Sequence, residues 1–406
     1  MVYSLRGDGM DLKAVAKGNL DSIRGRLVEL SRRVHANPEP GFQELRASGW
    51  IMEFLSGEGF RVEPGLCGLP TAFAASAGSG PLHVAICAEY DALPEIGHAC
   101  GHNIIAAAAV GAGIAAARVA DEAGLTVTVL GTPGEEAGNA GGKILMLDRG
   151  AFSGMHAAMM VHPAPSDILM PLIIASSMFE VEYTGKEAHA SAYPERGINA
   201  ADALTVAQTA IGLLRQHILP TDRIHGIITH GGDAPNIIPA RTTARYIVRG
   251  RTLSAVAELR ARVHGCFEAG AVATGAKLGI TGGDKPYAEM IHDTDMAAAF
   301  GRNSEALGRT FPDAAASAPG FSASTDMGNV SHLVPSIHPM IGIDSFPAVN
   351  HQAEFAQRCV SASADRALYD GALAMAWTAI DLAADPELCA RLLAGRQGPK
   401  PAAPRR

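Results

Sequence analysis

A cysteine and a histidine separated by one residue, Cys100 and His102, lie in the glycine-containing segment Gly97–Asn103. In an extended or turn backbone, side chains at positions i and i+2 point to the same side, so this thiol and imidazole can reach one metal ion. Gly97 and Gly101 allow the tight bend that this arrangement requires. The alternative is a buried cysteine beside histidines in a turn, but the residue types and their spacing favour a metal site.

Three apolar segments, each predicted to be a buried strand, are followed by acidic or metal-binding side chains. The first leads to the segment with Cys100, the second to Glu135 and Glu136, and the third to His162. The three segments are residues 82–87, 125–130 and 157–161. Because sites in open α/β sheets form outside the carboxyl ends of parallel strands, we expect these side chains to converge there.

A set of five sulfur, nitrogen and oxygen ligands can be assembled from these segments and from one loop near the end of the chain. The predicted ligands are Cys100, His102, Glu136, His162 and His351. Five ligands exceed what one tetrahedral zinc ion needs, so they suggest two ions that share a bridging group. Cys100 is the natural bridge, because a thiolate can bind two borderline cations.

Glu135 and Glu136 are adjacent, so on an extended backbone they point in different directions. We assign Glu136 to the metal and Glu135 to the role of general base and then general acid. Asp91 is predicted to orient a ligand imidazole as a hydrogen-bond acceptor. The alternatives are a solvated pair of loop carboxylates and an aspartate that stabilises a turn.

Three polar residues in the middle of the chain are further candidates. Asn236 and Arg241 carry donors suited to a substrate carboxylate or amide, with a polar hairpin as the alternative. His189 lies in a loop of small residues, and taken alone such a histidine is expected to be solvated.

The chain divides into an outer part with alternating helices and strands and an inserted middle part. From about residue 173 the apolar residues alternate, as in strands with one wet face. Four strands and two helices are predicted there, which indicates a small α+β domain. We therefore expect one domain of residues 1–172 and 287–406, interrupted by a second domain of residues 173–286.

The composition excludes several classes of partner. The formal net charge of −8 argues against nucleic acid, which would call for a basic surface. No apolar run has the length of a membrane span, and residues 1–17 lack the apolar core of a signal peptide, so we expect a cytoplasmic protein without membrane contact. The six cysteines show no disulfide spacing and are expected to be reduced thiols. The segment 396–406 is predicted to be disordered.

Together these motifs resemble those of the di-metal aminoacylase and carboxypeptidase family of amidohydrolases and dipeptidases. The resemblance runs from Arg33–Glu39 to the loop with His351, which is most of the chain. Its specific markers are Asp91–Pro94, Cys100–His102, Glu135–Glu136, His162–Pro163, the loop with His189, and Asn236–Pro239. Asn103 and the segment Ser324–Ser331 look most like the branch of Xaa-Arg (β-alanyl-lysine) dipeptidases and aminobenzoyl-glutamate hydrolases. Many other relatives have an aspartate in place of Asn103 and a Ser-Glu-Asp motif in place of the second segment.

The resemblance implies a zinc-exopeptidase-like catalytic domain of α/β class, with a mixed, mostly parallel sheet flanked by helices. It also implies an inserted, ferredoxin-like α+β lid that mediates homodimers. The predicted ligands match the family's metal positions, which take two divalent ions (zinc, manganese or cobalt), and Glu135 matches its catalytic base. His189 would then reach the site of the other subunit and stabilise the oxyanion.

We therefore expect hydrolysis of an amide bond in a small dipeptide or N-acyl amino acid, by a metal-bridging water that loses its proton to Glu135. One alternative is a deaminase or aryl-amide hydrolase that acts on a small aromatic compound with the same site. Another is a non-catalytic binding protein that has kept the fold. A zinc nucleoside deaminase is disfavoured, because the His-x-Glu and Cys-x-x-Cys motifs of that class do not occur.

Overall fold

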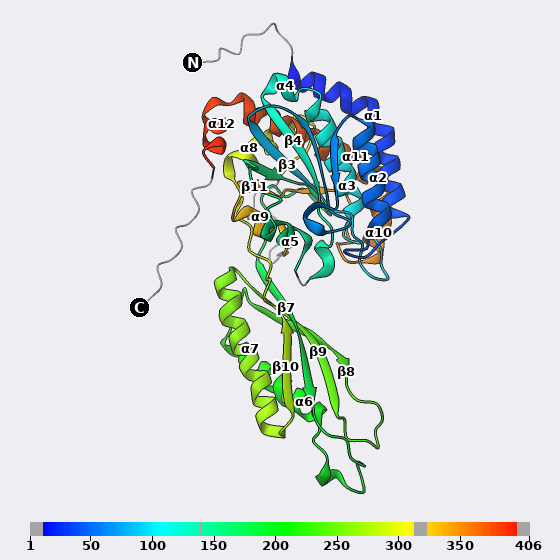
Figure 1. Ribbon diagram of the computed structural model, residues 1–406, viewed down its shortest axis with the longest axis vertical. Helices are drawn as coiled ribbons and strands as arrows, with labels where there is room; N and C mark the ends of the chain where they lie inside the picture. Colours follow the sequence, from blue (N-terminus) through cyan, green and yellow to red (C-terminus); the bar gives the residue numbers. More distant parts are fainter. Residues whose placement is uncertain (1–10, 139, 312–322, 396–406) are drawn as a thin grey trace, which may run out of the picture.

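The structure is a computed structural model that describes residues 11–138, 140–311 and 323–395. Figure 1 shows two bodies: a larger one, in which helices surround a sheet, and a narrower one that extends from its lower end. The narrower body is formed by the middle of the chain, and the first and the last described helices, α1 (Leu12–His35) and α12 (Pro386–Leu393), belong to the larger body. We call the larger body the catalytic domain and the narrower one the lid.

A six-stranded sheet forms the centre of the catalytic domain. Its strands, in spatial order, are β1 (Arg61–Pro64), β2 (Phe73–Gly78), β4 (Leu125–Gly131), β3 (Leu82–Ala88), β5 (Ala157–Met159) and β11 (Ser336–Ile337). The last four run parallel, and β1 and β2 run antiparallel at the other edge. β3 and β4 are buried over most of their length, as expected for continuous apolar runs covered on both faces. A parallel pair, β6 (His162–Ala164) and β12 (Met340–Gly342), continues beyond this sheet.

Long helices cover the sheet, and three of them pack on one another: α1 (Leu12–His35), α3 (His102–Ala117) and α11 (Ala362–Ala384). α3 is buried at nearly every position, because its alanines and glycines allow both the sheet and the neighbouring helices to approach closely. The other helices of this domain are α2 (Leu45–Gly57), α4 (Ala120–Ala123), α5 (Gly142–Asp148), α8 (Thr294–Ala306), α9 (Met327–Ser331), α10 (Ala353–Arg358) and α12 (Pro386–Leu393).

The lid is a four-stranded antiparallel sheet with two helices on one face. Its elements, in chain order, are β7 (Ala175–Thr184), α6 (Ala200–Leu214), β8 (Arg223–His230), β9 (Arg241–Gly250), α7 (Leu253–Thr274) and β10 (Lys277–Gly282). The spatial order β10-β7-β9-β8 with this β-α-β-β-α-β succession is ferredoxin-like. Phe179, Val181 and Tyr183 alternate along β7 and form part of a lid core separate from that of the catalytic domain.

The predicted fold class is confirmed, as are the three apolar strands. β2 and α8 were not singled out from the sequence. The domain limits at 172/173 and 286/287 stay predictions; the lid strands themselves run from Ala175 to Gly282. The segment 396–406, predicted to be disordered, lies outside the described residues. Among the described residues, none of the helices combines the length and apolarity needed to cross a bilayer.

Candidate metal centre

The predicted site residues of the catalytic domain lie at the carboxyl ends of the parallel strands, as expected. Asp91 follows β3, Glu135 and Glu136 follow β4, and His162 follows β5 and begins β6. His102 is the first residue of α3. The residue before it, Gly101, has a left-handed φ of 82°, and a Cβ atom there would lie 2.4 Å from Pro163 Cγ. Glycine at this position therefore lets Cys100 and His102 approach the strand that carries His162.

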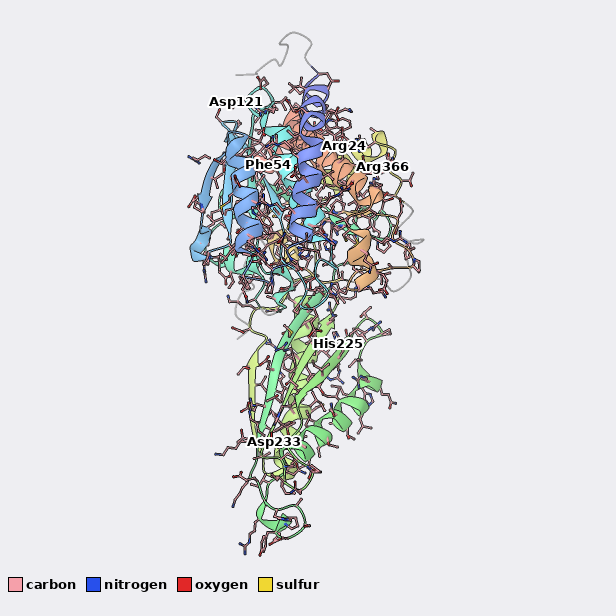
Figure 2. All side chains as sticks on the ribbon, turned by 90° about the vertical axis from the view of Figure 1, so that its right-hand side faces the viewer. Arg24, Phe54, Asp121, His225, Asp233 and Arg366 are labelled. Carbon is pink, nitrogen blue, oxygen red and sulfur yellow. The ribbon has the colours of Figure 1, made fainter. Side chains whose placement is uncertain are left out.

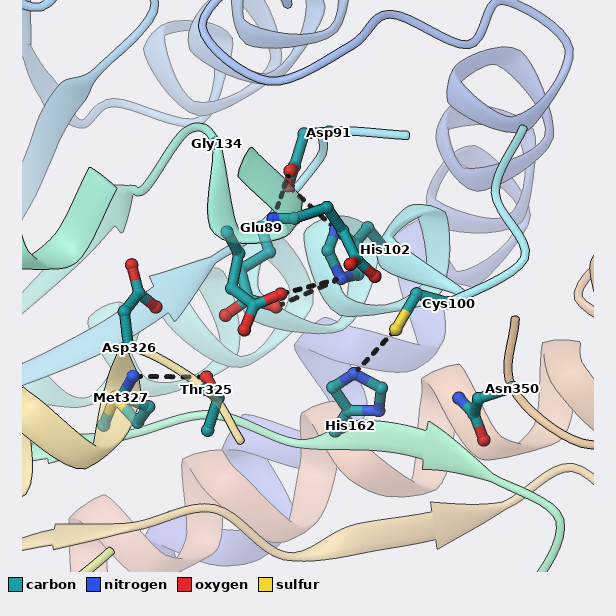
Figure 3. A network of polar contacts seen from close by, with 12 residues as sticks. Glu89, Asp91, Cys100, His102, Gly134, His162, Thr325, Asp326, Met327 and Asn350 are labelled. Carbon is teal, nitrogen blue, oxygen red and sulfur yellow. Dashed lines mark hydrogen bonds and ion pairs between the residues drawn. The ribbon is translucent and has the colours of Figure 1, made fainter. Parts of the chain in front are cut away.

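The five predicted ligands form two groups that share one atom. The ligand atoms of Cys100, His102 and His162 lie within 4.8 Å of one another, and so do those of Cys100, Glu136 and His351. Cys100 Sγ is 3.4 Å from His162 Nε2, a contact drawn in Figure 3, and Glu136 Oε1 is 3.1 Å from His351 Nε2. The structure thus brings the five residues together with Cys100 between the two groups.

The unpaired atoms of the site fit bound cations. His102 is fully buried, and its Nδ1 donates to Asp91 Oδ1 at 2.8 Å. Its Nε2 faces the ligand groups and makes no hydrogen bond, with only ion-pair contacts of 3.5 Å to Glu89 Oε2 and 4.0 Å to Glu135 Oε2. Buried polar atoms are nearly always paired, so such a nitrogen is expected where a ligand binds. A thiolate, imidazoles and a carboxylate together suit borderline divalent cations. The residues present therefore fit two divalent metal ions.

Side chains outside the two groups fix the ligands. Asp91 Oδ2 accepts the backbone N–H of Glu136 at 2.8 Å, so one carboxylate holds both His102 and the loop of the acidic pair. His162 Nδ1 donates to Pro163 O at 2.9 Å, and Asn350 Nδ2 donates to the same oxygen at 3.1 Å. His351 has a left-handed φ of 67° and its N–H donates to Ala99 O at 2.8 Å. A non-glycine residue in this conformation stores strain, which is common at functional sites.

The acidic residues of the centre shift one another's protonation. Burial, followed by the carboxylates of Glu89 and Glu136, raises the pKa of Glu135 well above its usual range. Burial disfavours the charged form of His102, yet Asp91 and Glu89 outweigh it and raise the pKa of this histidine to about 10. The carboxylates of Glu89, Asp91 and Glu136 contribute to these shifts, and their negative charge favours bound cations. A carboxyl with a raised pKa is also suited to accept a proton and release it later.

A buried ion network that the sequence analysis does not single out lies beside the centre. Lys143 is fully buried, and its Nζ contacts Glu89 Oε1 at 2.5 Å and Asp326 Oδ1 at 2.6 Å. Glu89 Oε2 is 3.5 Å from His102 Nε2, and Glu89, His102 and Glu135 form a third group of possible ligands. Asp326 lies in the marker segment Ser324–Ser331, but no local pattern marks Glu89 and Lys143, because they are far apart in the sequence and meet only in the folded chain.

Three predicted residues lie away from the metal centre of their own chain. His189 follows the outer end of β7 and pairs with Ile237, next to Asn236. The ten residues of β7 span about 30 Å at 3.3 Å per residue, which separates this loop from the catalytic domain. Figure 2 shows the same separation, with Asp233 on the outer half of the lid and His225 on the inner half. Arg241 forms an exposed ion pair with Glu182 at 2.6 Å.

Arg249, at the inner end of β9, is a candidate that the sequence analysis does not single out. Its Nη1 donates to Ser324 Oγ at 2.7 Å, and it forms no ion pair with a carboxylate among the described residues. Burial lowers the pKa of Arg249 while Glu135 and Glu136 oppose that shift, so its guanidinium lies within electrostatic reach of both. β9 carries several arginines at equal spacing, and only the strand register shows which one lies at the catalytic domain.

Comparison with known proteins shows which proteins this chain is similar to. A family model described as a peptidase dimerisation domain matches residues 175–274, which lie within the lid. The Xaa-Arg dipeptidase of Mus musculus is 39% identical over 394 residues, which cover 93% of this chain and 90% of that protein. One of the p-aminobenzoyl-glutamate hydrolase subunits of Escherichia coli is 31% identical over 276 residues, which cover 63% and 57% of the two chains.

Among solved structures, a dinuclear metal-binding peptidase of the M20 family from Bacillus subtilis superposes with a TM-score of 0.67. It is 20% identical, and the match covers 90% of this chain and 99% of that one. The fold, the matched dimerisation domain and the near full-length relative agree. The chain therefore belongs to the M20 family of metal-binding peptidases.

Proposed function

We propose that this protein hydrolyses the amide bond of a small dipeptide or N-acyl amino acid at a centre of two divalent metal ions. The observation that carries the proposal is that Cys100 belongs to both ligand groups, with Glu135 beside them. The names of the relatives, an Xaa-Arg dipeptidase and an aminobenzoyl-glutamate hydrolase, agree with this reaction. The mixed sulfur, nitrogen and oxygen ligands suit zinc, manganese or cobalt.

Different residues of the chain have different roles in the proposed hydrolysis. The bound cations would supply Lewis acidity, which lowers the pKa of water and polarises a carbonyl oxygen. Glu135 accepts the proton of the attacking water as the new C–O bond forms, and it gives that proton to the leaving nitrogen as the C–N bond breaks. Asp91 keeps His102 and the backbone of Glu136 in place throughout.

The lid supplies further groups. Dipeptides and N-acyl amino acids carry a carboxylate on the leaving amino acid. The guanidinium of Arg249, which donates to Ser324 and His225 but to no carboxylate among the described residues, would bind it. The substrate-binding role of Arg241 stays a prediction; its exposed guanidinium pairs with Glu182. His189 and Asn236 would serve the other subunit of a homodimer formed through the lid, where the imidazole stabilises the oxyanion. The match of the lid to a dimerisation domain supports this arrangement.

None of the six cysteines forms a disulfide, as is usual in reducing compartments, and we propose a cytoplasmic location.

A hydrolysis screen tests the proposed reaction. The protein is stripped with a chelator, reloaded with zinc, manganese or cobalt, and given β-alanyl and γ-aminobutyryl dipeptides, Xaa-Arg dipeptides, aminobenzoyl-glutamate and acylated amino acids. We expect metal-dependent release of a free amino acid. Release of ammonia would indicate a deaminase instead, and a protein that binds two metal ions but cleaves none of these amides would contradict the proposal.

A further inference from the structure

The lid joins the catalytic domain through two paired chain segments. Ser176, at the start of β7, and Tyr287, after β10, exchange both backbone hydrogen bonds at 3.0 and 2.9 Å. One step farther from the lid, Met290 N donates to Ile173 O at 3.3 Å. These four residues mark the connection through which the chain enters and leaves the lid, and we call it the hinge pair.

Tyr287 also contacts the loop of the acidic pair. Its hydroxyl donates to the backbone carbonyl of Glu135 at 2.6 Å, and its side chain is buried. Burial raises the pKa of Tyr287 well above its usual range, so the hydroxyl stays a donor. The hinge pair and the backbone of Glu135 are thus joined by one hydrogen bond.

Three side chains hold the short loop of residues 134–136. Glu44 Oε1 accepts the N–H of Gly134 at 2.8 Å and Asp91 Oδ2 accepts that of Glu136, while Tyr287 holds the carbonyl between them. Glu44 and Asp91 belong to the catalytic domain, whereas Tyr287 belongs to the hinge pair. The position of the Glu135 backbone therefore depends in part on where the lid is attached.

We propose that Tyr287 is a positioning residue for amide hydrolysis, because its hydroxyl fixes the backbone of Glu135 to the hinge pair. The proposal rests on the proposed function, in which Glu135 is the general base. Loss of the hydroxyl leaves the carboxylate in the site but frees its backbone to shift. Displacement of a catalytic group by about 1 Å can cost up to about 100-fold in rate.

The test compares Tyr287→Phe with Tyr183→Phe. Tyr183 is a matched control, because its buried hydroxyl also donates to a backbone carbonyl, that of Phe267, at 2.6 Å in the core of the lid. We expect both variants to bind two metal ions and to lose similar thermal stability. Only Tyr287→Phe should lower kcat, by about 10- to 100-fold, with KM changed less than about twofold. Equal kcat values in the two variants would overturn the proposal.

A second readout does not depend on turnover. Hydrogen–deuterium exchange of the peptide spanning residues 132–138 should be faster in Tyr287→Phe than in the parent protein and unchanged in Tyr183→Phe. Unchanged exchange in both variants would overturn the proposal. If the parent protein cleaves no amide, the proposed function fails, and this exchange measurement still decides whether the hydroxyl fixes the loop.

Discussion

Cys100 contributes its sulfur to both ligand groups, so a single side chain connects the two predicted cation positions. Residue types and their spacing predict the five ligands and Asp91, because each follows a buried strand or lies in a short motif, and the structure brings these six residues together. Glu44, Lys143 and Arg249 have no such local signal. Their place at the centre depends on packing between distant segments, which one sequence does not reveal.

At the scale of single residues, Glu135→Gln should leave two metal ions bound and lower kcat by about 10²–10⁴-fold, since the amide cannot accept the proton of water. Glu136→Gln is the matched control, because it changes the adjacent carboxylate and should reduce bound metal. Elemental analysis and steady-state kinetics on both variants check the assignment. Loss of metal in Glu135→Gln, with metal retained in Glu136→Gln, would show that the two roles are reversed.

The raised pKa of Glu44 predicts that the stability of the metal-free protein depends on pH. Burial, and next the charge of Asp91, raises the pKa of Glu44 to about 7 in the folded state, above the 4.5 of an ordinary glutamate. Because the folded state holds this proton more tightly, its stabilising contribution is complete below pH 4.5 and is lost as the pH rises to 7. The loss is at most about 3 kcal/mol, at 1.36 kcal/mol per pKa unit.

Urea denaturation between about pH 4.5 and 7.5, in the presence of a chelator, measures this effect. Glu44→Gln should flatten the decline in the free energy of unfolding, whereas Glu63→Gln, which changes an exposed carboxylate on β1, should not. Parallel pH profiles for Glu44→Gln and the parent protein would contradict the buried, titrating role of Glu44.

Helix and strand elements set where these residues meet. The continuous apolar runs predicted β3 and β4. α3 starts at His102, directly after Gly101 with its left-handed φ. α3 has apolar residues on all sides, so its sequence shows burial but not which neighbours cover it.

Two helix glycines, one closely packed and one in open space, are predicted to respond to alanine substitution with opposite changes in stability. A methyl group at Gly113 would lie 2.4 Å from Val129 Cγ2, so Gly113→Ala should destabilise the protein by about 1–3 kcal/mol through overpacking. Gly18, in α1, has open space at this position, and Gly18→Ala should stabilise by about 0.5–1 kcal/mol through helix propensity. Urea denaturation at neutral pH gives both values, and stabilisation by Gly113→Ala would contradict the packing described for α3.

At the scale of the whole molecule, the change to alternating apolar residues near residue 173 predicted an inserted domain, and the ferredoxin-like strand order of that domain is confirmed. The alternation of apolar residues does not show which end of the lid faces the metal centre. The structure places Arg249 at the inner end and His189 at the outer end of the lid sheet. A histidine so far from its own centre acts in catalysis only if a second chain supplies it.

Mixed dimers test this arrangement. His189→Ala and Glu135→Gln should each be inactive alone, but a refolded equal mixture should recover about a quarter of the parent activity, because half of the dimers are mixed and each has one complete site. If His189 acted within its own chain, no mixed dimer would have a complete site. Absence of recovered activity, with mixed dimers demonstrated by mass spectrometry, would contradict the shared site.

The central claim is that Cys100 stands between two cations. Anomalous diffraction from crystals of the zinc-loaded protein locates the ions directly. We expect two peaks about 3.5–4 Å apart, one beside His102 and His162 and one beside Glu136 and His351, with Cys100 Sγ bound to both. A single peak, or a pair of peaks with the sulfur of Cys100 turned away, would contradict the claim.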